Sequence, residues 1–131
     1  MSQLFTAVYE ISSAAHGHPT LLLNLVVDGR NDSIIGNARF DGGAGISVRG
    51  HHVEIEGEET MQAILLSGTP SIFGSDVGAP SAFQLLMVLP TAWKDGQVCY
   101  RMRFGERHPR VLEIHDGVAR ALAAAPVKLL H

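Results

Sequence analysis

Seven histidines are the residues of this sequence best suited to bind a metal ion. They are His16, His18, His51, His52, His108, His115 and His131. A zinc site needs three or four ligands that converge at about 2.0 to 2.3 Å, and no spacing here matches a zinc motif. Because consecutive residues of a strand point to opposite faces, His51 and His52 would not share a site. We therefore expect solvent-exposed loop histidines, with no metal and no cofactor.

An acidic stripe in the middle of the chain could also carry chemistry. It consists of His52, Glu54, Glu56 and Glu58, with Glu59 beside them. Alternating residues of a strand share one face, so the stripe could bind a cation or a basic partner. A carboxylate pair about 5 to 9 Å apart could hydrolyse a glycoside, but same-face neighbours meet that distance trivially. The simpler interpretation is a solvated outer face with Val53 and Ile55 buried behind it.

Charge is distributed unevenly along the chain. Residues 1–93 hold three Lys or Arg and nine Asp or Glu, whereas residues 94–131 hold seven and four. The basic residues that could form a surface patch are Arg101, Arg103, Arg107 and Arg110. Such a patch could contact phosphate or an acidic protein, or pair with the acidic stripe across the sheet. The net charge of -3 argues against nucleic acid as a partner.

Motifs of catalysis are missing from the sequence. The glycine-rich segment 42–45 lacks the lysine and the following Ser or Thr of a phosphate-binding loop. The serines show no nucleophile-elbow pattern, and Cys99 has no histidine close to it in sequence. A single cysteine also excludes an intramolecular disulfide and a four-cysteine zinc site. We assign no catalytic residue and do not expect an enzyme.

The hydrophobic pattern has a period of two residues along most of the chain, which predicts strands. The predicted strands are 5–11, 21–27, 34–40, 46–48, 53–55, 61–66, 82–89, 98–104 and 111–115. Asp28–Asp32 and Asp95-Gly96 are turn signals. Residues 118–125 hold five alanines and precede Pro126, which predicts one short helix. Residues 127–130 could form a last edge strand.

These elements predict the fold class and the compartment. With 131 residues and 46% hydrophobic residues, the chain is expected to form one all-β domain with a real core. About eight strands at hairpin spacing predict an antiparallel meander that forms a small barrel or, alternatively, a sandwich. The N-terminal residues do not resemble a signal peptide, and the longest apolar runs are too short to span a bilayer. We expect a soluble cytoplasmic protein without a membrane partner, although export without a cleaved signal stays open.

Several segments also form a familiar succession. They are Leu4–Tyr9, His18–Val27, Ile35–Arg39, Phe83–Leu89, Trp93–Arg101 and Pro126–Leu129. In this order they resemble a bacterial family of small domains of unknown function. The resemblance covers most of the chain and implies an all-β domain. It implies no activity, because the family offers none.

Two functions are compatible with these observations. The first is a non-enzymatic binding or protein-interaction module, which would recognise its partner through the segments 12–19, 41–50 and 68–81. The second is a carrier for a small apolar ligand, since an eight-stranded barrel can enclose one. The residues that could line its interior are Tyr9, Phe40, Phe83, Met87, Tyr100, Met102 and Phe104. The alternative for these side chains is that they only fill the core.

Overall fold

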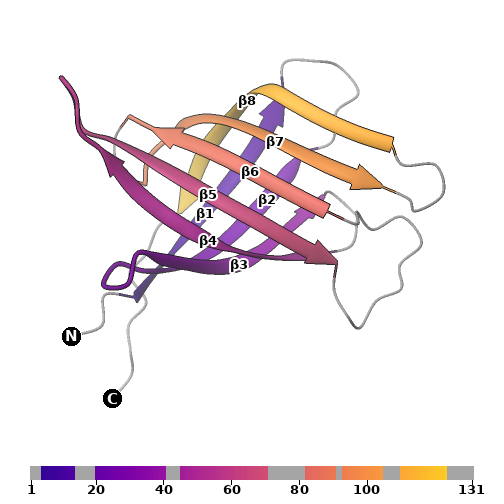
Figure 1. Cartoon of the computed structure of the whole chain (residues 1–131), viewed down its shortest axis with the longest axis horizontal. Helices are drawn as coiled ribbons and strands as arrows, with labels where there is room; N and C mark the ends of the chain where they lie inside the picture. The colour runs from indigo at the N-terminus through magenta and orange to yellow at the C-terminus, as the bar shows by residue number, and fades with distance from the viewer. Residues whose placement is uncertain are drawn as a thin grey trace.

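The protein is an eight-stranded antiparallel barrel. The computed structural model describes residues 4–13, 20–40, 45–70, 82–90, 93–104 and 110–123. The strands are β1 (Leu4–Ser13), β2 (Leu21–Asp28), β3 (Ser33–Phe40), β4 (Gly45–Ile55), β5 (Met61–Pro70), β6 (Ala82–Leu89), β7 (Gly96–Phe104) and β8 (Arg110–Ala123). Each strand pairs with the next, and β8 pairs with β1, so the sheet closes on itself (Figure 1). The predicted meander and barrel are confirmed, and the sandwich alternative is excluded.

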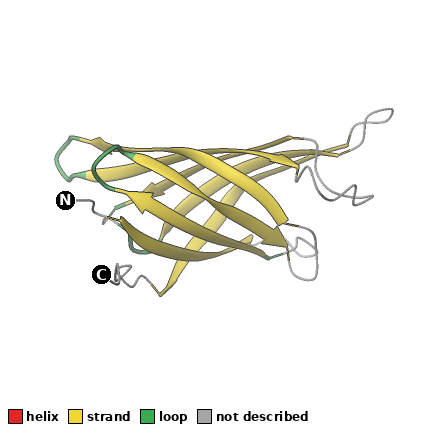
Figure 2. Cartoon of the chain, turned by 90° about the horizontal axis from the view of Figure 1, so that it is seen from below, coloured by secondary structure: helices red, strands yellow, loops and turns green. Residues whose placement is uncertain are grey.

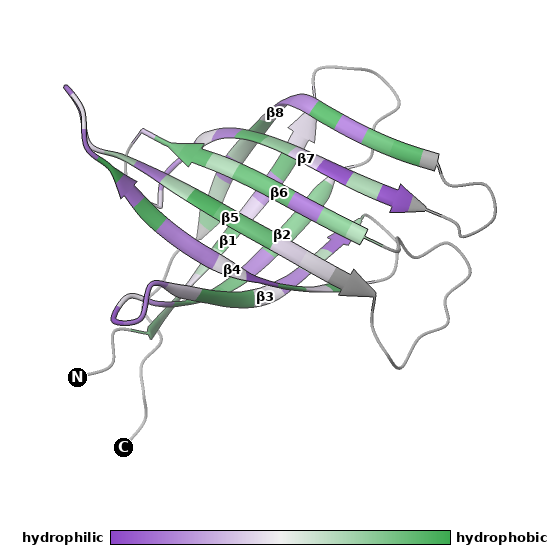
Figure 3. Cartoon of the chain, viewed as in Figure 1, coloured by the Kyte–Doolittle hydropathy of each residue, from purple (hydrophilic) through white to green (hydrophobic). Residues whose placement is uncertain are grey.

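The core follows from the period-two pattern. Ala7, Tyr9 and Ile11 of β1 are buried, and so are the matching positions of the other strands. Figure 3 shows the resulting alternation of hydrophobic and hydrophilic residues along the strands. One continuous cluster of buried side chains therefore fills the interior.

The alanine-rich segment is a strand, so the predicted C-terminal helix is wrong. Residues 118–123 belong to β8, and Figure 2 shows only strands and loops in the described part of the chain. Ala119 pairs with Ile11 of β1 on one side and with Gly96 of β7 on the other. A helix of about two turns is marginal without packing, whereas these two ladders satisfy the backbone and close the barrel. Residues 124–125 and the predicted strand at 127–130 lie outside the described residues.

A second correction concerns β4. The sequence predicts two short strands with Val53 and Ile55 buried, but one strand runs from Gly45 to Ile55. Its alternation starts with Ile46 and Val48 inside and continues unbroken, so Val53 and Ile55 are 49% and 47% exposed. Side chains of a strand alternate between its two faces. Because Ile46 and Val48 point into the core, the odd-numbered residues of β4 point outward along its whole length. Val53 and Ile55 therefore point outward.

Candidate functional site

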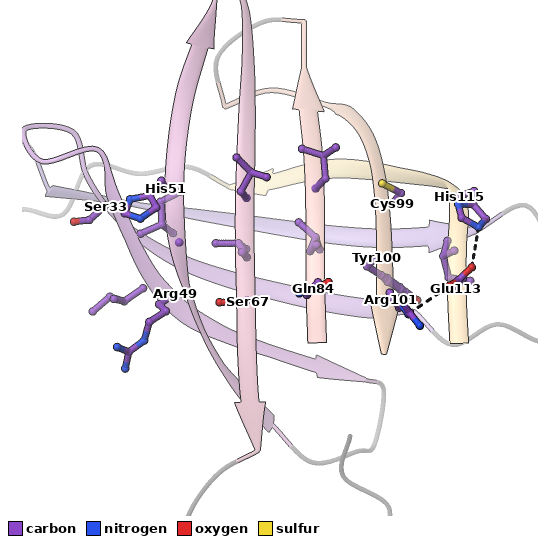
Figure 4. A pocket seen from close by; sticks show the side chains of 18 residues that line it. Ser33, Arg49, His51, Ser67, Gln84, Cys99, Tyr100, Arg101, Glu113 and His115 are labelled. Atoms are coloured by element: carbon purple, nitrogen blue, oxygen red, sulfur yellow. Dashed lines mark ion pairs between the residues drawn. The ribbon is translucent and has the colours of Figure 1, made fainter. Parts of the chain in front are cut away.

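A groove of about 850 Å³ crosses the outer wall of the barrel from β3 to β8. Two rows of outward-pointing side chains border it, because the ladders hold the strands in register. The first row is Ile35, Arg49, Ser67, Gln84, Arg101 and Glu113; the second is Ser33, His51, Leu65, Leu86, Cys99 and His115. Figure 4 shows both rows from close by. We call this feature the outer groove.

One side of the middle of the outer groove is apolar, and Ser67 and Gln84 form the other side. Leu65 of β5 lies directly opposite Leu86 of β6, and Leu86 lies opposite Cys99 of β7. The side chains of Leu65 and Leu86 are 49% and 37% exposed, and Ile35 is exposed further along the groove. Leu65 and Leu86 thus form a small exposed apolar patch on the barrel wall.

Charged residues occupy the two ends of the outer groove. At the β7–β8 end, Arg101 Nε lies 3.4 Å from Glu113 Oε1, and His115 Nε2 lies 3.3 Å from Glu113 Oε2 (Figure 4). At the β4 end, Arg49 forms no ion pair with any described residue. Exposed pairs of this kind contribute little to stability, at most about 1 kcal/mol each.

A β-bulge shapes the β7–β8 end. The register between these strands shifts between Val98 and Tyr100, so that His115 and Asp116 together oppose the single residue Cys99. A bulge of this kind bends its strand and redirects the side chains beside it. It places His115 and the partly exposed Cys99 thiol at the same end of the outer groove.

A second polar cluster lies around His52. Its ring is half-buried: Nδ1 lies 3.3 Å from Gln62 Nε2, and Nε2 lies 3.6 Å from Asp32 Oδ1. Trp93 packs edge-on against His52 at 5.5 Å and against Phe5 at 4.9 Å between ring centroids. The buried Oε1 atom of Gln62 lacks a hydrogen-bond partner among the described residues. The cluster joins β1, β4, β5 and the β6–β7 turn.

The residues predicted to line a ligand cavity contact one another inside the barrel. Five of them belong to the buried core, and Phe40 packs against it half-buried; the five are Tyr9, Phe83, Met87, Tyr100 and Met102. The rings of Phe83 and Tyr100 lie 6.0 Å apart. The side chain of Phe104 lies outside the described residues. This arrangement supports the packed-core interpretation, and the interior carrier stays a prediction.

The predicted basic patch is divided. Arg101 lies in the outer groove and pairs with Glu113 rather than with the Glu54–Glu59 stripe. Arg103 is exposed on the same strand and has an interaction of its own. Arg107 and the side chain of Arg110 lie outside the described residues.

The histidines form no metal centre in the described part of the chain. No group of three or more His, Cys, Asp or Glu side chains comes together there. As predicted, His51 and His52 point to opposite faces: His51 is exposed and His52 is half-buried. The predicted recognition segments fall largely on residues 14–19, 41–44 and 71–81, which lie outside the described residues. Within the described residues, no helix is long and apolar enough to cross a membrane.

Sequence reasoning missed the outer groove, although one signal was present. Residues 82–89 are apolar on both faces except at Gln84, which is typical of a central strand that is covered on both sides. In this barrel Leu86 points outward and is 37% exposed. An apolar outer face on a strand of a small barrel is therefore the signal that could have revealed the site.

A comparison with known protein families identifies the family of this chain. Residues 2–107 match the family described as Domain of unknown function (DUF1842). The search of curated proteins found no match. The expected membership of a family of unknown function is confirmed, and the family's description names no activity.

Proposed function

The chain belongs to the DUF1842 family, and from this premise we propose that it is a non-enzymatic protein-interaction module that binds its partner in the outer groove. The observation that carries the proposal is the exposed pair Leu65 and Leu86 at the apolar centre of that groove. Burying apolar surface is favourable by about 25 cal/mol per Å², so a partner that covers this pair gains affinity.

The shape of the groove favours a protein over a small ligand. It crosses six strands, which at a spacing of about 4.8 Å corresponds to roughly 24 Å. It is open to solvent along the barrel wall, whereas small-molecule sites usually enclose most of the ligand surface. An apolar centre between charged ends is also the usual composition of a protein interface, with its apolar core and polar rim.

Site-specific photo-crosslinking in the native cell tests the proposal. A photoreactive side chain replaces Leu86 in the groove, and in a separate variant it replaces Leu122. Leu122 is a matched control because it is 45% exposed on β8 and does not line the groove. We expect position 86 to yield a discrete crosslinked protein that position 122 does not yield. No product at position 86, or the same products at both positions, would overturn the proposal.

A further inference from the structure

The far end of the β4–β5 hairpin is a second exposed feature with apolar residues. It comprises residues 53–60, all of them exposed, and we call it the hairpin tip. Figure 1 shows it reaching past the ends of β6 and β7. Val53 and Ile55 are its apolar residues, and they pair with Ala63 and Met61 of β5. Two large apolar side chains at the end of a projecting hairpin need a partner surface to leave water.

The hairpin tip is strongly acidic. It holds Glu54, Glu56, Glu58 and Glu59 and no Lys or Arg. None of these carboxylates forms an ion pair with a described residue. The tip therefore combines unpaired negative charge with exposed apolar side chains.

The outer groove is the chemical complement of the hairpin tip. Its centre carries the exposed pair Leu65 and Leu86, and Arg49 and Arg101 stand in the neighbouring row on β4 and β7. Three strand spacings separate these arginines, roughly 14 Å, with Ser67 and Gln84 between them. Exposed apolar residues and opposite charges thus occur on the hairpin tip and on the outer groove, which adjoin where Val53 follows His51 on the outward face of β4.

From this complementarity we infer that the partner of the outer groove is a second copy of this chain, which inserts its hairpin tip. Val53 and Ile55 then cover Leu65 and Leu86, and the tip carboxylates face Arg49 and Arg101. The inference rests on the proposed function, because it names the partner of the same groove. It also explains why Val53 and Ile55 are apolar although the barrel does not bury them.

The geometry of this contact determines the kind of assembly. One tip-in-groove contact leaves one tip and one groove free in the resulting pair. These either bind each other, which gives a two-fold dimer with two reciprocal contacts, or bind further copies, which gives rings or open chains. The tip is small against the roughly 800 Å² per partner of a standard interface, so the association should be weak. Salt should weaken it further by screening the charges.

Sedimentation velocity of the full chain tests the inference. The wild-type protein should gain mass above 14.1 kDa as its concentration rises, and less so in high salt. Ile55→Lys inactivates the tip, and Leu86→Lys inactivates the groove, both at exposed positions outside the core. Each variant alone should stay at 14.1 kDa, and Leu122→Lys, outside both surfaces, should behave as wild type. Circular dichroism confirms that each variant is folded.

Mixing the two inactive variants is the decisive step. The Leu86→Lys variant keeps an intact tip, and the Ile55→Lys variant keeps an intact groove, so these two surfaces can bind each other. The groove of Leu86→Lys and the tip of Ile55→Lys are inactive. The mixture should therefore form complexes of two chains and nothing larger. A mixture that stays monomeric while wild type associates overturns the inference.

Failure of this inference is distinguishable from failure of the proposed function. A wild-type protein that stays monomeric up to about 1 mM overturns self-association. If position 86 then crosslinks to a different protein, the groove is still a docking site and only the identity of the partner is wrong. Crosslinking of position 86 to the hairpin tip of a second copy supports both.

Discussion

The carbonyl oxygen of Leu65 occupies the space that a Cβ atom on Gly50 would need. Backbone, not a side chain that could rotate, fills this space, so an alanine would force β4 and β5 apart. Gly50→Ala should therefore lower the free energy of unfolding by at least about 2 kcal/mol in urea titrations. Gly45→Ala is the control, because its Cβ would meet no atom within 4 Å. Gly45→Ala should change the free energy of unfolding by no more than about 0.5 kcal/mol. Equal losses in the two variants would contradict the close approach of the Leu65 carbonyl to Gly50.

Leu65 and Leu66 are neighbours in sequence, but their replacement by alanine should lower the stability of the fold by very different amounts. Leu66 is buried in the core, whereas Leu65 points into the outer groove. Leu66→Ala should cost about 2 to 5 kcal/mol of unfolding free energy, as buried leucines do. Leu65→Ala should cost less than about 1 kcal/mol. The reverse order in thermal or chemical unfolding would mean that β5 is shifted by one residue, which exchanges its faces.

The fold could be predicted to a large extent because its pattern is local. Alternation along β1, β2 and β3 already identifies the inward residues, and turn residues such as Asp28–Asp32 mark the hairpin between β2 and β3. The prediction failed where the secondary structure of a segment depends on pairing with a strand far away in the sequence. Whether residues 118–123 are helix or strand depends on pairing with β1, more than a hundred residues earlier in the chain.

Trp93 provides a test of backbone strain. Its φ is 62°, in the left-handed region that costs a non-glycine residue about 1 to 2 kcal/mol. Both Trp93→Ala and Trp93→Gly lose the ring contacts with Phe5 and His52, but only glycine relieves the strain. Glycine normally costs about 0.5 to 1 kcal/mol relative to alanine. Here Trp93→Gly should be the more stable variant by about 0.5 to 1 kcal/mol in urea unfolding. An alanine variant of equal or higher stability would show that the backbone relaxes.

The candidate site was harder to predict than the fold, for a physical reason. Arg49, Leu65, Leu86 and Arg101 lie on four strands, and only the register between those strands brings them into one groove. Register across several ladders depends on every bulge and turn in between. Arg101 could be predicted as exposed, but its pairing with Glu113 follows from the register between β7 and β8.

The hydroxyl of Tyr9 is buried without a hydrogen-bond partner among the described residues. Removing it should help the folded state, so Tyr9→Phe should raise the free energy of unfolding by about 1 kcal/mol at pH 7. The measurement is a urea titration. Tyr100→Phe is the comparison, because no such unpartnered hydroxyl is found there. A loss of stability in Tyr9→Phe would mean that the hydroxyl is hydrogen-bonded after all.

The two tyrosines also predict how stability depends on pH. Burial, together with the charge of Asp95, raises the pKa of Tyr9, and burial raises the pKa of Tyr100. Each raised pKa in the folded state means that the proton is held more tightly there than in the unfolded chain. The stability that the two protonated tyrosines give the folded state is therefore fully present below about pH 10, and it is lost as the pH rises above that value. Urea titrations between pH 8 and pH 11 should show stability falling beyond about pH 10, by up to about 1.4 kcal/mol per pH unit for each tyrosine. The chain has only these two tyrosines. In the double variant Tyr9→Phe and Tyr100→Phe, the free energy of unfolding should therefore fall less steeply above pH 10 than in the wild type. An equally steep loss in the double variant would assign the alkaline transition to other groups.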